Sequence, residues 1–169
     1  MRKVGIPGVE ELSEGTQQFL DVLNDEDDLA VIVISASYLD ACLAAMLKRR
    51  LRQGNTSDRL LDSQRGALGS FATRADLCYS LRLVEKDLYQ DLIRIAEIRN
   101  TVAHNHLAMT FGWPEVASLV AQLTYAEMSL GRSGTEPSGI MEDMSVARNR
   151  FVITAVLASH RLLLSGLGI

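Results

Sequence analysis

The chain has 169 residues, 47% of them hydrophobic and 22% charged, and it carries a formal net charge of −4. This length and composition predict one globular domain spanning residues 1–169, and they exclude a collagen-like or disordered chain. Because a lone DNA-binding module is usually basic, the acidic charge disfavours direct binding to duplex DNA. The two cysteines lie in apolar stretches, so we expect a cytoplasmic protein with no disulfide framework, no metal and no cofactor.

Helical patterns begin soon after the N-terminus. Residues 1–8 are expected to be flexible, and a first helix is predicted over residues 9–23. A long second helix follows, from the acidic run after Asn24 to the basic residues around Arg52. Acidic residues suit the positive N-terminal end of a helix and basic residues suit its negative C-terminal end. These charges therefore indicate helix termini rather than a binding patch.

The second helix contains the apolar stretch Leu29–Leu47, which is long enough to span a membrane. Asp40 lies inside this stretch, and an aspartate in mid-membrane costs about 3 kcal/mol on insertion scales. We therefore expect a buried central helix and no membrane contact.

Helix signals continue through the middle of the chain. Ser70 is expected to cap a third helix that ends near Leu81, and a fourth helix runs from about Lys86 into the His104 region. Pro114 is expected to start a fifth helix, because proline at the first helical position loses no hydrogen bond.

The last part of the chain combines a loop with a helix. Residues 131–139 are rich in Gly, Ser and Pro and are expected to form a flexible loop, followed by a helix from about residue 143 to residue 167. No alternating strand pattern is present anywhere. The predicted fold is therefore all-α, a compact bundle of five to six helices in which two long helices are central.

Two charged residues lie on helix faces that are otherwise apolar. Asp40 lies eleven positions after Leu29 on the second helix, and Arg99 lies eleven positions after Leu88 on the fourth, so each shares its helix's apolar stripe. Because an unpaired buried charge is prohibitive, Asp40 and Arg99 are predicted to form an ion pair. That pair is either a structural device that fixes helix register or a means of holding Arg99 rigidly for ligand contact.

The segment from Arg99 to His104 contains an arginine, a following asparagine and a histidine five positions after the arginine. This R-x4-H arrangement resembles the signature of HEPN helical domains, many of which are metal-independent ribonucleases that work as dimers. The resemblance implies that Arg99 stabilises phosphate charge, that His104 acts as a general acid/base and that Asn100 orients them. On a straight helix, however, Arg99 and His104 lie about 140° apart, so the competing interpretation is a structural arginine followed by a histidine at the helix end.

A broader resemblance covers residues 29–107. Its blocks are residues 36–40 with Leu43 and Leu47, residues 68–71 with Arg74, Asp76, Leu77 and residues 79–81, and residues 98–100 with Ala103 and His104. Together these blocks resemble the mannitol operon repressor (MtlR-like) family. The resemblance implies an all-helical fold, no recognisable DNA-binding motif and regulation through protein partners.

We therefore predict a transcriptional regulator or repressor that acts through protein–protein interaction, with no catalytic residues. The last helix carries one apolar stripe from Phe151 to Leu162 and a second stripe from Val152 to Leu163, which favours a homodimer. The alternative function is a HEPN-type ribonuclease, for example the toxin of a toxin–antitoxin pair. In that alternative Arg99, Asn100 and His104 are catalytic and RNA is the ligand.

Overall fold

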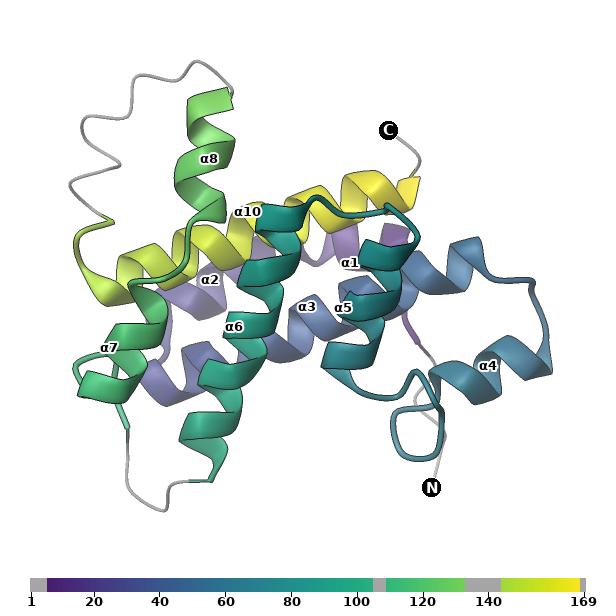
Figure 1. Ribbon diagram of the computed structural model, residues 1–169, viewed down its shortest axis with the longest axis horizontal. Coiled ribbons are helices and arrows are strands. Elements are labelled where there is room, and N and C mark those ends of the chain that lie inside the picture. Colours follow the sequence, from purple (N-terminus) through teal and green to yellow (C-terminus); the bar gives the residue numbers. More distant parts are fainter. Residues whose placement is uncertain (1–5, 105–108, 133–143, 168–169) are drawn as a thin grey trace.

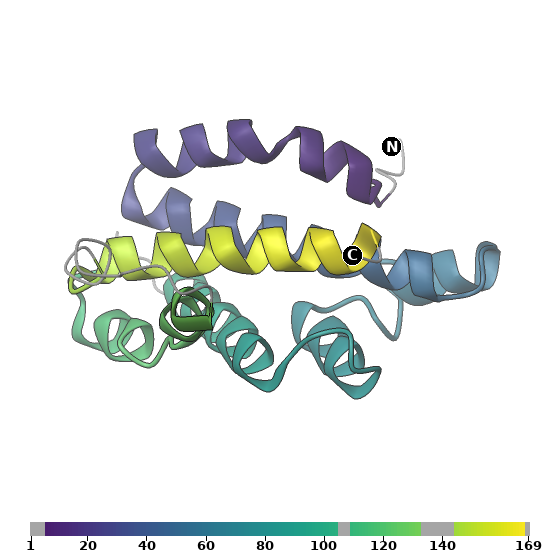
Figure 2. The ribbon, with the colours of Figure 1, turned by 90° about the horizontal axis from the view of Figure 1, so that it is seen from above.

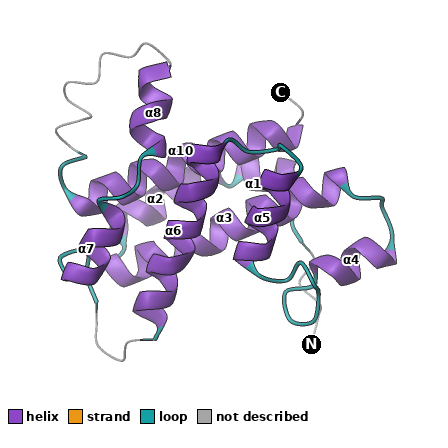
Figure 3. Ribbon diagram, viewed as in Figure 1, coloured by secondary structure: helices purple, strands orange, loops and turns teal. Residues whose placement is uncertain are grey.

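The structure is a computed structural model that describes residues 6–104, 109–132 and 144–167. Every regular element in these ranges is a helix, and no strand occurs among them (Figure 3). The all-α prediction is confirmed. The described ranges contain more helices than the five or six predicted, because one predicted helix is divided in two and two short helices were missed.

The predicted first helix is two helices. α1 (Val9–Glu14) and α2 (Thr16–Asp25) are separated by Gly15, whose N–H still bonds to the carbonyl of Glu11 at 3.1 Å. Glycine is a poor helix interior residue because its backbone loses the most freedom on ordering, so a break at this position has a local cause.

α3 (Asp28–Arg50) is the predicted long helix, with slightly shorter bounds. Asp27 caps it by accepting the N–H of Ala30 at 2.8 Å, which satisfies one of the free amides of the first turn. Three basic residues occupy its last turn, as the helix dipole favours.

The segment after α3 folds back as α4 (Asn55–Leu61), where the sequence pattern predicts only a turn. α5 (Phe71–Ser80) begins as predicted at Ser70, whose hydroxyl accepts the N–H of Thr73. α6 (Lys86–Ala103) and α7 (Pro114–Val120) also match their predicted starts, and proline holds the first position of α7.

α8 (Tyr125–Arg132) was not predicted, and it extends into the expected loop at residues 131 and 132. Residues 133–139 of that loop, and residues 1–5 of the expected flexible N-terminus, lie outside the described residues. The last helix, α10 (Ala147–Leu167), confirms the predicted C-terminal helix.

The helices are arranged in three layers. Figure 2 shows α1 and α2 on one side, α3 and α10 in the middle, and α5 to α8 on the other side. α3 and α10 pack along each other as the central pair (Figure 1), whereas the two long helices identified from sequence as central are α3 and α6. α3 is long and apolar enough to cross a membrane by length and composition alone, but 56% of its apolar window is buried inside this fold. α3 is thus the predicted buried central helix.

The chain covers one apolar face of α10 completely and the other only in part, because Val152 and Val156 of the second stripe are partly buried. Phe151, Ala155, Ala158 and Leu162 are completely buried, and the second stripe ends at Leu163, which is also buried. α1 packs against the C-terminal part of α10, where Val9 lies so close to Gly166 that a Cβ there would meet its methyl group at 2.9 Å. The second face of α10 therefore keeps some exposed apolar surface, and the homodimer stays a prediction.

Candidate functional site: a buried arginine and the open side of α3

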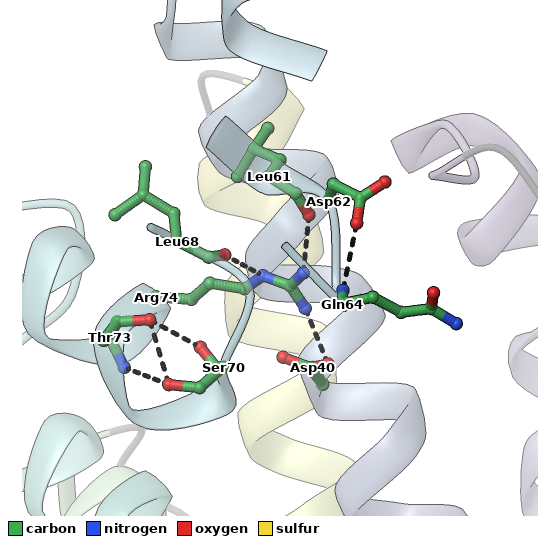
Figure 4. Close-up of polar contacts among 8 residues, drawn as sticks. All are labelled: Asp40, Leu61, Asp62, Gln64, Leu68, Ser70, Thr73 and Arg74. Carbon is green, nitrogen blue, oxygen red and sulfur yellow. Dashed lines mark hydrogen bonds and ion pairs between the residues drawn. The ribbon is translucent and has the colours of Figure 1, made fainter. Parts of the chain in front are cut away.

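The buried ion pair predicted for Asp40 exists, but its partner is different. The guanidinium of Arg74 on α5 lies 2.6 Å from Oδ2 of Asp40 on α3 (Figure 4). The side chain of Arg74 is 4% exposed and that of Asp40 is 29% exposed. The predicted pair between Asp40 and Arg99 is therefore wrong: Arg99 is only partly buried, and its long stem allows its charged end to reach water near the end of α6.

Arg74 is held by backbone acceptors as well as by Asp40. Its Nε donates to the carbonyl of Leu68 and its Nη2 to the carbonyl of Leu61, each at 2.9 Å (Figure 4). Three acceptors on three sides fix the planar guanidinium, as charge-assisted hydrogen bonds do where a cation must be buried. The arginine thereby joins α3, α5 and the segment that connects α4 to α5.

The segment between α4 and α5 folds tightly because two of its residues are glycines that lie directly against backbone oxygens of other residues. A Cβ on Gly66 would overlap the carbonyl oxygen of Leu60, and one on Gly69 would lie 2.5 Å from the carbonyl oxygen of Asp62. This close approach also allows the N–H of Leu68 to bond to the Leu60 carbonyl at 2.8 Å. The carbonyl of Leu68 is thus presented to Arg74 by a loop that only glycine permits.

A cleft of about 830 Å³ opens beside this ion pair. Asp40 and Arg74 form part of its wall. The end of α3, α4 and the segment between α4 and α5 contribute further charged groups: Lys48, Asp58, Arg59, Asp62 and Arg65. Lys48 lies 3.5 Å from Asp58, whereas Arg59 and Arg65 are exposed and make no ion pair within the described residues. Oδ1 of Asp40 is buried and accepts no hydrogen bond from any described residue. The cleft thus presents exposed guanidinium groups over a rigid, buried wall.

The residues of the predicted ribonuclease motif lie elsewhere, at the C-terminal end of α6. Asn100 and His104 are exposed on this end, and the backbone N–H of His104 bonds to the Asn100 carbonyl at 3.1 Å. His104 is the residue that closes the helix, and α6 is continuous from Lys86 to Ala103. The side chain of Arg99 therefore starts from a different face of the same regular helix. Residues 105–108 lie outside the described part of the chain.

Both cysteines and the carboxyl group of Asp91 are buried inside the fold. Burial raises the pKa of both Cys42 and Cys78 to about 12, so neither thiol is ionised near neutral pH. Asp91 is fully buried, where its carboxylate accepts the N–H groups of Thr124 and Tyr125 at 2.8 and 2.7 Å and pairs with Arg94. Among the residues that the structure describes, no group of three or more His, Cys, Asp or Glu could hold a metal ion.

The described residues thus form an all-helical fold in which a charged cleft opens beside a buried arginine. The model of the mannitol repressor family matches residues 16–163, which is most of the chain. The chain therefore belongs to the mannitol repressor family, as the sequence blocks indicated.

Two solved structures share this fold. A chain in the X-ray structure of the MtlR–HPr complex from Escherichia coli is 16% identical, with a TM-score of 0.67; the match covers 88% of the present chain and 98% of that one. A possible transcriptional regulator, YggD, from Shigella flexneri is 12% identical with a TM-score of 0.66, covering 87% and 97% of the two chains. No curated protein sequence matches. At these identities the structural likeness establishes the fold.

The sequence pattern of α5 also indicated the ion pair between Asp40 and Arg74, but the helical wheels were drawn only for the two long helices. Arg74 lies between the buried residues Phe71, Ala75 and Cys78 at helical spacing, so it shares the inward stripe of α5. Arg74 entered the sequence argument only through the family resemblance. The same reasoning that selected Asp40, applied to this ten-residue helix, would have added Arg74 to Arg99 as a candidate partner.

Proposed function

We propose that this protein is a cytoplasmic regulator of transcription that acts by binding a partner protein, without contacting duplex DNA itself. The observation that carries the proposal is the cleft beside Arg74. One part of its wall is the buried guanidinium of Arg74, which is held by three acceptors. Arg59 and Arg65 also line the cleft, and they have no ion-pair partner among the described residues. A rigid wall with free charged groups around it suits recognition of a protein surface.

The mannitol repressor family supports the regulatory part of this proposal. One structural neighbour is a chain from a complex between MtlR and HPr, so we take HPr as the first candidate partner of this chain. The net charge of −4 supports a protein partner over DNA, because a phosphate backbone is repelled by an acidic chain.

Isothermal titration of the purified protein with HPr from the same cell tests the proposal. We expect a 1:1 complex whose affinity falls at least fivefold in Arg59→Glu, since the exposed guanidinium lies at the mouth of the cleft. Lys86→Glu is the matched control, because it reverses the same charge at the start of α6, away from the cleft. A wild-type protein that does not bind HPr would refute this choice of partner, and retention of a promoter duplex at physiological salt would refute the indirect mechanism.

A further inference from the structure

A second hollow, of about 360 Å³, lies between α2 and α3 on the side of α3 that also carries the cleft. Its walls are mainly apolar: Pro7, Leu12, Phe19, Val22, Ile34 and Tyr38. We call this hollow the α2–α3 groove. Pro7 lines both hollows, so the groove and the cleft are neighbours.

The wall of the groove is fixed by its own contacts. The rings of Phe19 and Tyr38 stack with their centroids 4.1 Å apart, and the Tyr38 hydroxyl donates to the carbonyl of Leu12 at 2.6 Å. Burial raises the pKa of Tyr38, so this hydroxyl stays protonated and keeps its donor role. A groove that is formed before binding loses little freedom when it is filled, which favours affinity.

Apolar surface continues beside the groove along α3. Val33, next to Ile34, is 40% exposed, and Leu29 one turn earlier is 38% exposed. The helical wheel predicted that Leu29 lies on the apolar stripe of this helix, but both residues are exposed. They face outward because α10 and α6 cover the opposite side of α3, and together with the groove they give an apolar surface of the kind that partners cover.

The segment that carries α1 and α2 is strongly acidic, and the two arginines that reach it, Arg49 and Arg148, are each paired with a carboxylate. Residues 10–28 contain eight carboxylates, and no lysine or arginine occurs between Lys3 and Lys48. From the helical repeat, Asp25 lies about 20° from the groove residue Gln18, and Asp21 lies about 60° from Gln18 on the side away from Phe19, so both border the edge of the groove. Glu11, Asp21 and Asp25 are exposed and make no ion pair within the described residues.

We infer that the α2–α3 groove docks a partner protein through a positively charged surface that inserts an apolar side chain between α2 and α3. The inference rests on the proposed function for the existence of a protein partner. An apolar anchor in a pocket with complementary charges around it is the usual arrangement of an interface hot spot. The carboxylates repel nucleic acid and anionic lipid, and the groove lacks the converging polar groups of a small-ligand site.

Two synthetic amphipathic helical peptides of equal length test the partner chemistry directly, one built from Leu and Lys and the other from Leu and Glu. We expect the Leu/Lys peptide to bind the wild-type protein and the Leu/Glu peptide not to bind. Val22→Thr removes apolar surface from the groove without changing charge, and should weaken binding at least fivefold. Its matched control is Met128→Thr, an apolar side chain that is 49% exposed on α8.

Charge is tested separately. Asp25→Lys should weaken peptide binding several-fold, whereas Glu97→Lys on α6 changes the net charge equally and should leave it within twofold. Equal effects of Val22→Thr and Met128→Thr, or of the two charge reversals, would overturn the inference. So would a wild-type dimer in sedimentation that Val22→Thr dissociates, because a second copy would then occupy the groove. Failure of the HPr titration alongside the expected peptide results would overturn the proposed partner and leave the groove assignment standing.

Discussion

The ion pair between Asp40 and Arg74 predicts a large and specific loss of stability when the arginine is replaced. In Arg74→Met the apolar stem survives, but the carbonyls of Leu61 and Leu68 lose their donor and the carboxylate of Asp40 loses its counter-ion. A carbonyl left without a donor in a buried site costs about 1–3 kcal/mol, and breaking a buried ion pair from one side costs about 3–5 kcal/mol. Because Asp40 retains some contact with water, we take each cost at its lower limit, and the two carbonyls and the ion pair together then give about 5 kcal/mol.

Arg49→Met is the matched control. Arg49 also lies 2.6 Å from its carboxylate, that of Glu10, but its side chain is 43% exposed and that of Glu10 is 67% exposed. Water screens such a pair, so equal geometry should yield a much smaller loss. Arg99→Met is the second control, because Arg99 was the partner predicted from sequence.

Urea and thermal unfolding followed by circular dichroism measure all three variants. For a domain of this size each 1 kcal/mol lowers Tm by about 2–4 °C, so Arg74→Met should melt roughly 10–20 °C below the wild type. The double variant Asp40→Asn, Arg74→Met should lose less than the sum of the single losses, since the two groups interact. A loss in Arg74→Met no greater than that in Arg49→Met, or an equally large loss in Arg99→Met, would refute the reasoning.

Three further predictions concern Gly66, the buried Asp91 and the predicted ribonuclease motif. Gly66→Ala should unfold at markedly lower urea because its Cβ overlaps the Leu60 carbonyl, whereas Gly131→Ala in α8 meets no atom within 4 Å and should be neutral or slightly stabilising by the same assay. Burial raises the pKa of the Asp91 carboxyl above its ordinary value of 3.8, so folding favours the neutral form, and the free energy of unfolding falls as pH rises through the raised pKa. The free energy of unfolding of Asp91→Asn, measured relative to that of the wild type, should therefore increase as pH rises from about 4. A difference that stays constant with pH would contradict this. Incubation with RNA in EDTA should produce no 2′,3′-cyclic phosphate ends, and products lost in His104→Ala but kept in Glu97→Lys would instead establish the ribonuclease.

Helix positions and fold class could be predicted because they depend on local chemistry. Ser70 and Pro114 occupy positions where their own backbone and side-chain preferences define a helix start, and the apolar stripe from Leu88 to Val102 is completely or almost completely buried. The short helices α4 and α8 were missed for a physical reason. Segments of seven or eight residues are marginal as isolated helices, so tertiary packing rather than local preference stabilises them.

The partner of Asp40 could not be deduced by requiring that the two long helices each supply one charge. A helical wheel reports the direction of a side chain around its own axis, but it does not report which neighbouring helix covers that direction. α3 is covered by α10 on one side and by α5 and α6 on another, so a carboxylate on α3 had more than one candidate helix. The glycine contacts that bring the Leu68 carbonyl to Arg74 are also tertiary, and no local pattern specifies them.

The incomplete cover over α3 connects the fold to the proposed role. α10, α5 and α6 bury the side of α3 that carries Ile32 and Leu39, while α1 and α2 leave Val33 and the two hollows open. One end of this open side is apolar and bordered by carboxylates that make no ion pair within the described residues, and the other end carries the exposed guanidinium groups at the cleft. A partner with the opposite arrangement of charge would be oriented along α3 as well as attracted to it, since the reversed orientation sets like charges against each other. The double variant Asp25→Lys, Arg59→Glu reverses the charge at both ends of this side, and it should therefore bind HPr more weakly than either single variant does.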